Sequence, residues 1–277
     1  MSEQRPAEID RDTMPFVAPC KQLSPFAPFG WIRLGIRDLG RAPQQSLTYG
    51  FFMALVMALV VWLAWTRGSH YIMLAMLGGF VFIAPLACVG LYAISAQLER
   101  GQEPSMARSL RAAFRRHIGN ELIFAIVLLV IFMVWSRAAL MITVFFPIGA
   151  EPDFESLLPY LTIGTVVGGF FAIVTFAASA FSLPMIMHRD VDSITAVVTS
   201  INAVLRNKFA MLLWLALIMT GLIVGFLTAF VGLILILPVI GHGAWHGYLE
   251  TIDADEFPRH SVGITSTPRA GQETDRN

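Results

Sequence analysis

The longest uncharged run of the chain is the feature that most restricts its fold. Phe209–Leu249 is 41 residues long and contains no Lys, Arg, Asp or Glu. As one α-helix rising about 1.5 Å per residue, this run would be roughly 60 Å long. The hydrocarbon core of a bilayer is only about 30 Å thick. The run therefore predicts two membrane spans joined by a turn near Thr228–Gly232.

The composition supports a membrane protein and gives no sign of catalysis. The chain is 56% hydrophobic and 14% charged, whereas soluble domains contain about 25% charged residues. No phosphate-binding glycine loop, nucleophile elbow or metalloprotease motif is present, and the basic residues are spread between the apolar runs. We therefore predict that the protein is not an enzyme, has no catalytic residue and no cofactor, and binds no nucleic acid.

The pattern of apolar and polar runs predicts an all-α fold with six spans arranged as three hairpins, each preceded by a cytoplasmic amphipathic helix. The spans are expected at about 47–65, 71–94, 118–135, 157–187, 209–228 and 231–249, within a membrane domain of residues 29–250. The flanking segments, residues 1–28 and 251–277, are polar and are predicted to be disordered.

The first amphipathic helix is predicted at Trp31–Gln45. Its apolar face is expected to contain Trp31, Leu34, Ile36 and Leu39, and its polar face Arg33, Arg37 and Arg41. Such a helix favours a position in the membrane interface.

The distribution of basic residues predicts the orientation. The N-terminal segment, the two polar linkers at 95–117 and 188–208, and the C-terminal tail hold 17 of the 19 Lys and Arg residues, and the opposite side holds only Arg67 and Arg137. Because basic loops stay in the cytoplasm, we predict a multi-pass protein of the bacterial inner membrane with both termini cytoplasmic.

Three histidines near the predicted cytoplasmic boundary form the candidate metal site. His242 and His246 are four residues apart, so they share one face of a helix. His188 ends the fourth predicted span, and two imidazoles at this spacing can bind one metal ion. A haem would need axial histidines on facing helices. The alternative is that these histidines belong to an interfacial belt that fixes the depth of the last helix.

Charged side chains directly after His188 form a second candidate site. Arg189, Asp190 and Asp192 could contact a lipid or substrate headgroup. The alternative is structural: Asp192 is suited to cap the following helix, because a carboxylate offsets the partial positive charge at a helix N-terminus.

Four stretches share a specific pattern. They are Trp31–Leu39 (WIRLGIRDL), Gly90–Gly101 (GLYAIS and LERG), Ser182–Asp192 (SLPM and RDVD) and Leu237–Tyr248 (LPVIGHGAWHGY). Together they resemble a bacterial family of predicted integral membrane proteins of unknown function, some of them labelled cytochrome c oxidase subunit I-like. The resemblance covers roughly Ser24–Asp253; Gly247 and Glu250 depart from its usual residues. It implies a membrane fold and no known activity. Six histidines, with only three near one another in the predicted topology, are too few for the oxidase label.

The function predicted from the sequence is that of a non-catalytic scaffold, lipid-interacting or accessory protein, with the bilayer and a membrane protein complex as partners. Two alternatives stay open. A small-molecule permease would have its site between helices kinked by Pro85, Pro184 and Pro238. A metal- or haem-binding respiratory accessory protein would use the three histidines.

Overall fold

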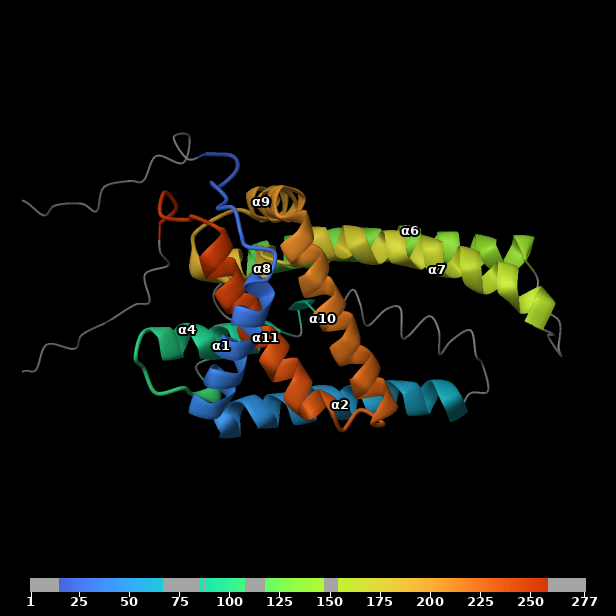
Figure 1. Ribbon diagram of the computed structural model, residues 1–277, viewed down its shortest axis with the longest axis horizontal. Helices are drawn as coiled ribbons and strands as arrows, with labels where there is room; N and C mark the ends of the chain where they lie inside the picture. Colours follow the sequence, from blue (N-terminus) through green and yellow to red (C-terminus); the bar gives the residue numbers. More distant parts are fainter. Residues whose placement is uncertain (1–14, 67–84, 87, 108–117, 147–153, 259–277) are drawn as a thin grey trace, which may run out of the picture.

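The computed structural model describes residues 15–66, 85–86, 88–107, 118–146 and 154–258, and this part of the chain is all-α (Figure 1). Its helices are α1 (Ala27–Arg41), α2 (Pro43–Thr66), α4 (Val89–Glu99), α6 (Ile118–Phe145), α7 (Phe154–Ser179), α8 (Ser182–His188), α9 (Ser193–Arg206), α10 (Lys208–Leu227) and α11 (Leu233–Thr251).

Four segments in the described part are long and apolar enough to cross a membrane. They are Pro43–Leu63, Leu122–Phe145, Leu157–His188 and Lys208–Leu227. The prediction of an all-α membrane protein with several spans is therefore confirmed. Most of the predicted span at 71–94 lies outside the described residues. The predicted span at 231–249 is the helix α11, which is not among the four, so the number six stays a prediction.

The predicted break in the uncharged run is present. α10 ends at Leu227 and α11 begins at Leu233. Ala229 and Phe230 between them have positive φ angles of 50° and 70°, which reverse the chain in a way that a continuous helix cannot. The Thr228 hydroxyl accepts a hydrogen bond from the Gly232 amide at 2.9 Å and stabilises the turn.

The fourth predicted span, 157–187, is interrupted. α7 ends at Ser179 and α8 begins at Ser182, and the amide of Phe181 between them donates to the Ser200 hydroxyl at 3.1 Å. Pro184 lies in the first turn of α8, where a proline removes no helical hydrogen bond. The structure therefore has a short break just before Pro184 in place of a bend within one continuous helix.

Helix α11 lies at the centre of the fold and contacts α1, α2, α4 and α10 (Figure 1). Glycines permit two of these contacts. A Cβ atom on Gly35 of α1 would lie 2.3 Å from the Val239 carbonyl oxygen, and one on Gly50 of α2 would lie 2.3 Å from the Ile234 carbonyl oxygen. The backbones of α1 and α2 therefore pack directly on α11.

The first amphipathic helix differs from its prediction in extent and in its buried face. It ends at Arg41, and Pro43 begins a new helix, α2. The buried face of α1 contains Trp31, Gly35 and Asp38, which follow one another at helical spacing. Ile36, predicted on the apolar face, is 55% exposed. The spacing of the apolar residues predicted the wrong face because α1 contacts α11 partly through Gly35 and Asp38, which are not apolar side chains.

Both ends of the described chain pack together, contrary to the predicted disorder of residues 15–28 and 251–258. The Lys21 amide donates to the Thr251 carbonyl at 2.8 Å, and the Asp253 amide donates to the Pro19 carbonyl at 2.9 Å. Ala18 and Phe257 are buried. The two segments are polar in composition, but these backbone hydrogen bonds and the burial of Ala18 and Phe257 hold them in place. Residues 1–14 and 259–277 lie outside the described part.

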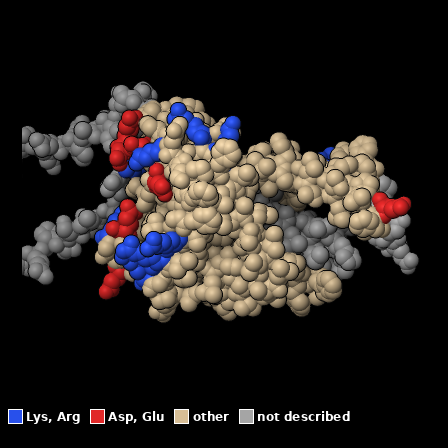
Figure 2. Space-filling model, viewed as in Figure 1, with Lys and Arg blue, Asp and Glu red and all other residues tan. Residues whose placement is uncertain are grey.

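Charged side chains gather at one end of the molecule in the view of Figure 2, and the remaining surface is almost entirely uncharged. This end includes the outer face of α1, where Arg33, Arg37 and Arg41 are exposed. The far end of the α6–α7 pair carries the exposed Glu155. A membrane protein whose charged residues lie mostly at one membrane surface, and whose remaining body lies in lipid, is expected to show this distribution.

Candidate functional site

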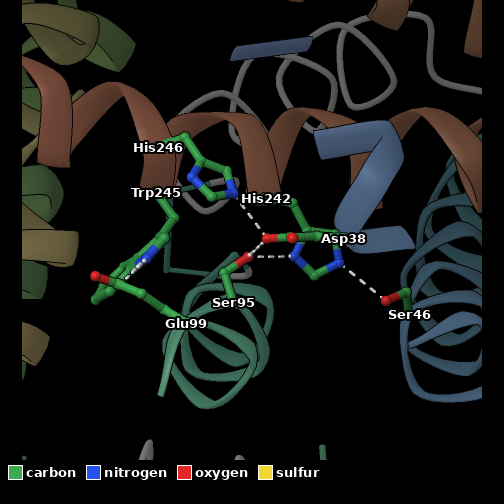
Figure 3. Close-up of polar contacts among 7 residues, drawn as sticks. All are labelled: Asp38, Ser46, Ser95, Glu99, His242, Trp245 and His246. Carbon is green, nitrogen blue, oxygen red and sulfur yellow. Dashed lines mark hydrogen bonds and ion pairs between the residues drawn. The ribbon is translucent and has the colours of Figure 1, made fainter. Parts of the chain in front are cut away.

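A network of buried polar side chains connects four helices at the charged end (Figure 3). On one side of it, the Ser95 hydroxyl of α4 donates to Asp38 Oδ2 of α1 at 2.9 Å, and His246 Nε2 of α11 lies 2.8 Å from the same oxygen. On the other side, His242 Nδ1 lies 2.7 Å from the Ser95 oxygen, and His242 Nε2 lies 2.9 Å from the Ser46 hydroxyl of α2.

The hydrogen-bond donors in this network can be assigned by counting protons. Ser95 has one hydroxyl proton and gives it to Asp38, so His242 Nδ1 must donate to the Ser95 oxygen. His242 Nε2 then accepts from Ser46, which corresponds to a neutral imidazole. His246 donates to Asp38. Both ring nitrogens of His242 are therefore used by serines, which leaves neither for a metal ion.

Burial makes this network energetically important. Asp38 is 3% exposed and His242 is 0% exposed, and a buried carboxylate is costly unless it is paired. Burial raises the pKa of Asp38, but hydrogen bonds from His246 and Ser95, together with the nearby imidazoles, outweigh it, so the pKa lies below its usual value. Asp38 is therefore a carboxylate at neutral pH and the acceptor on which the network depends.

Two tryptophans extend the polar contacts around α11. The indole of Trp245 donates to Glu99 Oε2 of α4 at 3.2 Å. The indole of Trp31 of α1 donates to Glu250 Oε2 at 2.7 Å. The Trp31 ring also packs edge-on against Trp214 of α10, with ring centroids 5.3 Å apart. The last helix is thus joined to α1 and α4 by charged as well as neutral hydrogen bonds.

The structure brings together two of the three predicted metal-binding histidines. His242 and His246 both contribute to the Asp38 network, as their spacing of four residues allows. His188 instead lies beside aromatic rings: its Nδ1 is 3.0 Å from the Tyr248 hydroxyl, and its ring centroid is 5.5 Å from that of Trp245. Within the described residues, no group of three or more His, Cys, Asp or Glu side chains could hold a metal ion.

The predicted headgroup residues serve two different structural contacts. Arg189 is 5% exposed; its guanidinium donates to the Phe257 carbonyl at 2.8 Å and to Asp255 Oδ1 at 2.6 Å, so it fixes the C-terminal segment. Asp192 caps α9 by accepting from the amides of Ile194 and Thr195. The burial of Asp192 raises its pKa, but these hydrogen bonds reverse the shift and lower it.

The neighbouring Asp190 is exposed, and its amide donates to the Pro258 carbonyl at 2.9 Å. The backbone at this position thus also holds the segment that follows α11. Of the three predicted headgroup residues, only Asp190 and Asp192 have side chains on the surface.

The sequence did not identify Asp38, Ser46 or Ser95 as site residues. Asp38 and Ser95 were visible only as members of the stretches Trp31–Leu39 and Gly90–Gly101, and the histidines belong to the stretch Leu237–Tyr248. Three of the four stretches that carry the family resemblance thus meet in one network.

Comparison with known proteins agrees with the fold and supplies no activity. No curated protein and no solved structure matches the chain. One family model matches, and its description does not include the oxidase label. The family resemblance seen in the sequence is confirmed over residues 72–188, which match the family described as predicted integral membrane protein (DUF2189).

Proposed function

We propose that this chain is a non-catalytic protein of the bacterial inner membrane that binds anionic lipid headgroups through the outer face of α1. The observation that carries the proposal is the exposed stripe of Arg33, Arg37 and Arg41, spaced four residues apart on one face. Exposed Phe29 and Ile36 lie among these arginines. Arginines mixed with large apolar side chains are typical of a helix at the boundary between headgroups and acyl chains.

The buried network supports this function because it holds α1 in place. Asp38 on the inner face of α1 is bonded to α4 and α11, and Gly35 lets the helix backbone lie against α11. The arginines on the opposite face therefore have a fixed position. A fixed array of cations loses less conformational freedom on binding anions than a flexible one.

The same network gives little support to a catalytic, metal or haem function. Its histidine and carboxylate groups are engaged with one another and with serines, and Ser46 and His242 are fully buried. We propose that it is structural, and that the charged end faces the cytoplasm with both termini on that side of six spans. A partner in a membrane protein complex would bind at surfaces other than the outer face of α1.

Substitution of the three arginines tests the proposal. The triple variant Arg33→Gln, Arg37→Gln, Arg41→Gln is expected to lose the preference for anionic lipid. Each basic residue near an anionic surface contributes about 1 kcal/mol, so the full effect is on the order of 100-fold in affinity. Spin-labelled phosphatidylglycerol, compared with spin-labelled phosphatidylcholine, measures this preference in reconstituted vesicles.

Arg137→Gln provides the control, because Arg137 is exposed on α6 and away from α1. This variant should keep the preference of the natural protein. High salt should weaken the preference of the natural protein and leave that of the triple variant almost unchanged. An unchanged preference for phosphatidylglycerol in the triple variant would show that α1 is not the headgroup-binding surface.

A further inference from the structure

A cavity of about 130 Å³ lies between α4, α7, α10 and α11, and its lining does not include the side chains of the Asp38 network. Its lining includes Tyr92, Ala172, Thr175, Trp214, Ile240 and Ala244. Among the described residues that line it, none is charged, and nearly all of the surface that they provide is apolar. Apolar cavities of about this size, near 150 Å³, hold a benzene-sized molecule. The cavity therefore suits one ring or a short length of hydrocarbon chain.

Thr175 is one of the few polar residues in this lining. Its side chain is buried, with 1% of the residue exposed, and its hydroxyl has no hydrogen-bond partner among the described residues. Other threonines in these helices satisfy their hydroxyls locally: Thr220 donates to the Ala216 carbonyl at 2.8 Å, and Thr251 donates to the Gly247 carbonyl. A buried hydroxyl without a partner is unfavourable and uncommon, so this position suits a hydrogen-bonding group that the described residues do not supply.

We infer that the cavity binds a neutral, membrane-soluble molecule whose apolar ring or chain fills it and whose carbonyl oxygen accepts a hydrogen bond from Thr175. The described lining residues carry no charge, which selects a neutral ligand, because a buried unpaired charge is strongly unfavourable. α7 and α10, which supply part of the lining, are in segments that can span a membrane, so the bilayer is the source of the ligand. A quinone head group and the acyl ester of a lipid both provide this chemistry.

Trp214 provides a local probe, because it lines the cavity and is buried from bulk lipid. The protein would carry Phe in place of Trp62, Trp65 and Trp135, which are outside the cavity, and would be placed in phosphatidylcholine nanodiscs. Two quenchers are compared: decylubiquinone, and phosphatidylcholine brominated in its acyl chains near the ester group. Saturable quenching by the first identifies the quinone source, and quenching by the second identifies the lipid source.

Two cavity variants and two matched surface variants complete the test. Ala172→Phe fills the cavity and should abolish quenching, whereas Val166→Phe on the exposed surface of α7 should not. Thr175→Val removes one hydrogen bond at nearly constant volume and should weaken binding about 3- to 10-fold, whereas the exposed Thr165→Val should have no effect.

The inference is overturned if neither quencher acts on the parent protein. It is also overturned if quenching persists in Ala172→Phe, or if Thr175→Val binds as tightly as Thr165→Val. The neutral quenchers do not depend on the arginines of α1, so the triple glutamine variant should bind them normally. The outcome is therefore independent of whether the proposed headgroup function is correct.

Discussion

Replacement of Gly35 by alanine is expected to destabilise the protein strongly. The added Cβ atom would lie 2.3 Å from the Val239 carbonyl oxygen and 3.0 Å from the Gly243 amide nitrogen. Both obstacles are backbone atoms of α11, so no side chain can rotate away and the helices must separate. Overpacking usually costs about 1–3 kcal/mol, and we expect the upper part of this range or more. Thermal unfolding in detergent, followed by tryptophan fluorescence, measures the loss.

The same helix supplies matched controls. Gly30 and Gly40 are exposed, and a Cβ atom on either would meet no described atom within 4 Å. Alanine at these positions should stabilise the helix by up to about 1 kcal/mol, because alanine has the higher helix propensity. Equal melting temperatures for the Gly35→Ala and Gly30→Ala variants would contradict the direct packing of α1 on α11.

Removal of the Asp38 carboxylate is expected to have the second large effect. Asp38→Ala leaves the donors of Ser95 and His246 without their acceptor. Each buried donor left without a partner costs about 1–3 kcal/mol, and Asp38→Ala leaves two of them. The measurement is again thermal unfolding, combined with His246→Ala in a double-mutant cycle, which should show a coupling energy of about 0.5–3 kcal/mol.

Asp255→Ala is the control for Asp38. It removes a carboxylate that also pairs with a basic group, but the side chain of Asp255 is 80% exposed. Water can therefore take its place beside Arg189, which keeps its hydrogen bond to the Phe257 carbonyl, and the loss of stability should be smaller than at Asp38. If Asp38→Ala were no more destabilising than Asp255→Ala, the network would not support the fold as described.

The lowered pKa of Asp38 also predicts an acid dependence of stability. A carboxyl group whose pKa is lower in the folded state stabilises the protein at pH values above its unfolded pKa, and the stabilisation disappears as the pH falls through the folded value. The ordinary pKa of this group is 3.8, so stability should decline below about pH 4. His242 and His246 of α11 and Ser95 of α4 face this carboxylate. Melting temperatures between pH 3 and 6 should therefore fall less in Asp38→Ala than in the parent.

The sequence could predict those features that depend on neighbouring residues. The turn between α10 and α11 follows from the length of the uncharged run, and the cap at Asp192 follows from its position before a helix. The buried network could not be predicted in this way. Asp38, Ser46, Ser95 and His242 come from four helices, and no local pattern relates them. The same limit explains why Ile36 was placed on the wrong face of α1: the partner of that helix, α11, lies about 200 residues later in the chain.

The central position of α11 has a consequence for biosynthesis. The ribosome makes this helix well after α1 and α2, yet those two helices have their closest backbone contacts on it. Until α11 is made, Asp38 has no histidine partner, and Gly35 and Gly50 lack the backbone against which they pack. A chain that stops before Leu233 would thus lack the helix on which α1 and α2 pack, and the face of α1 that carries Gly35 and Asp38 would be uncovered.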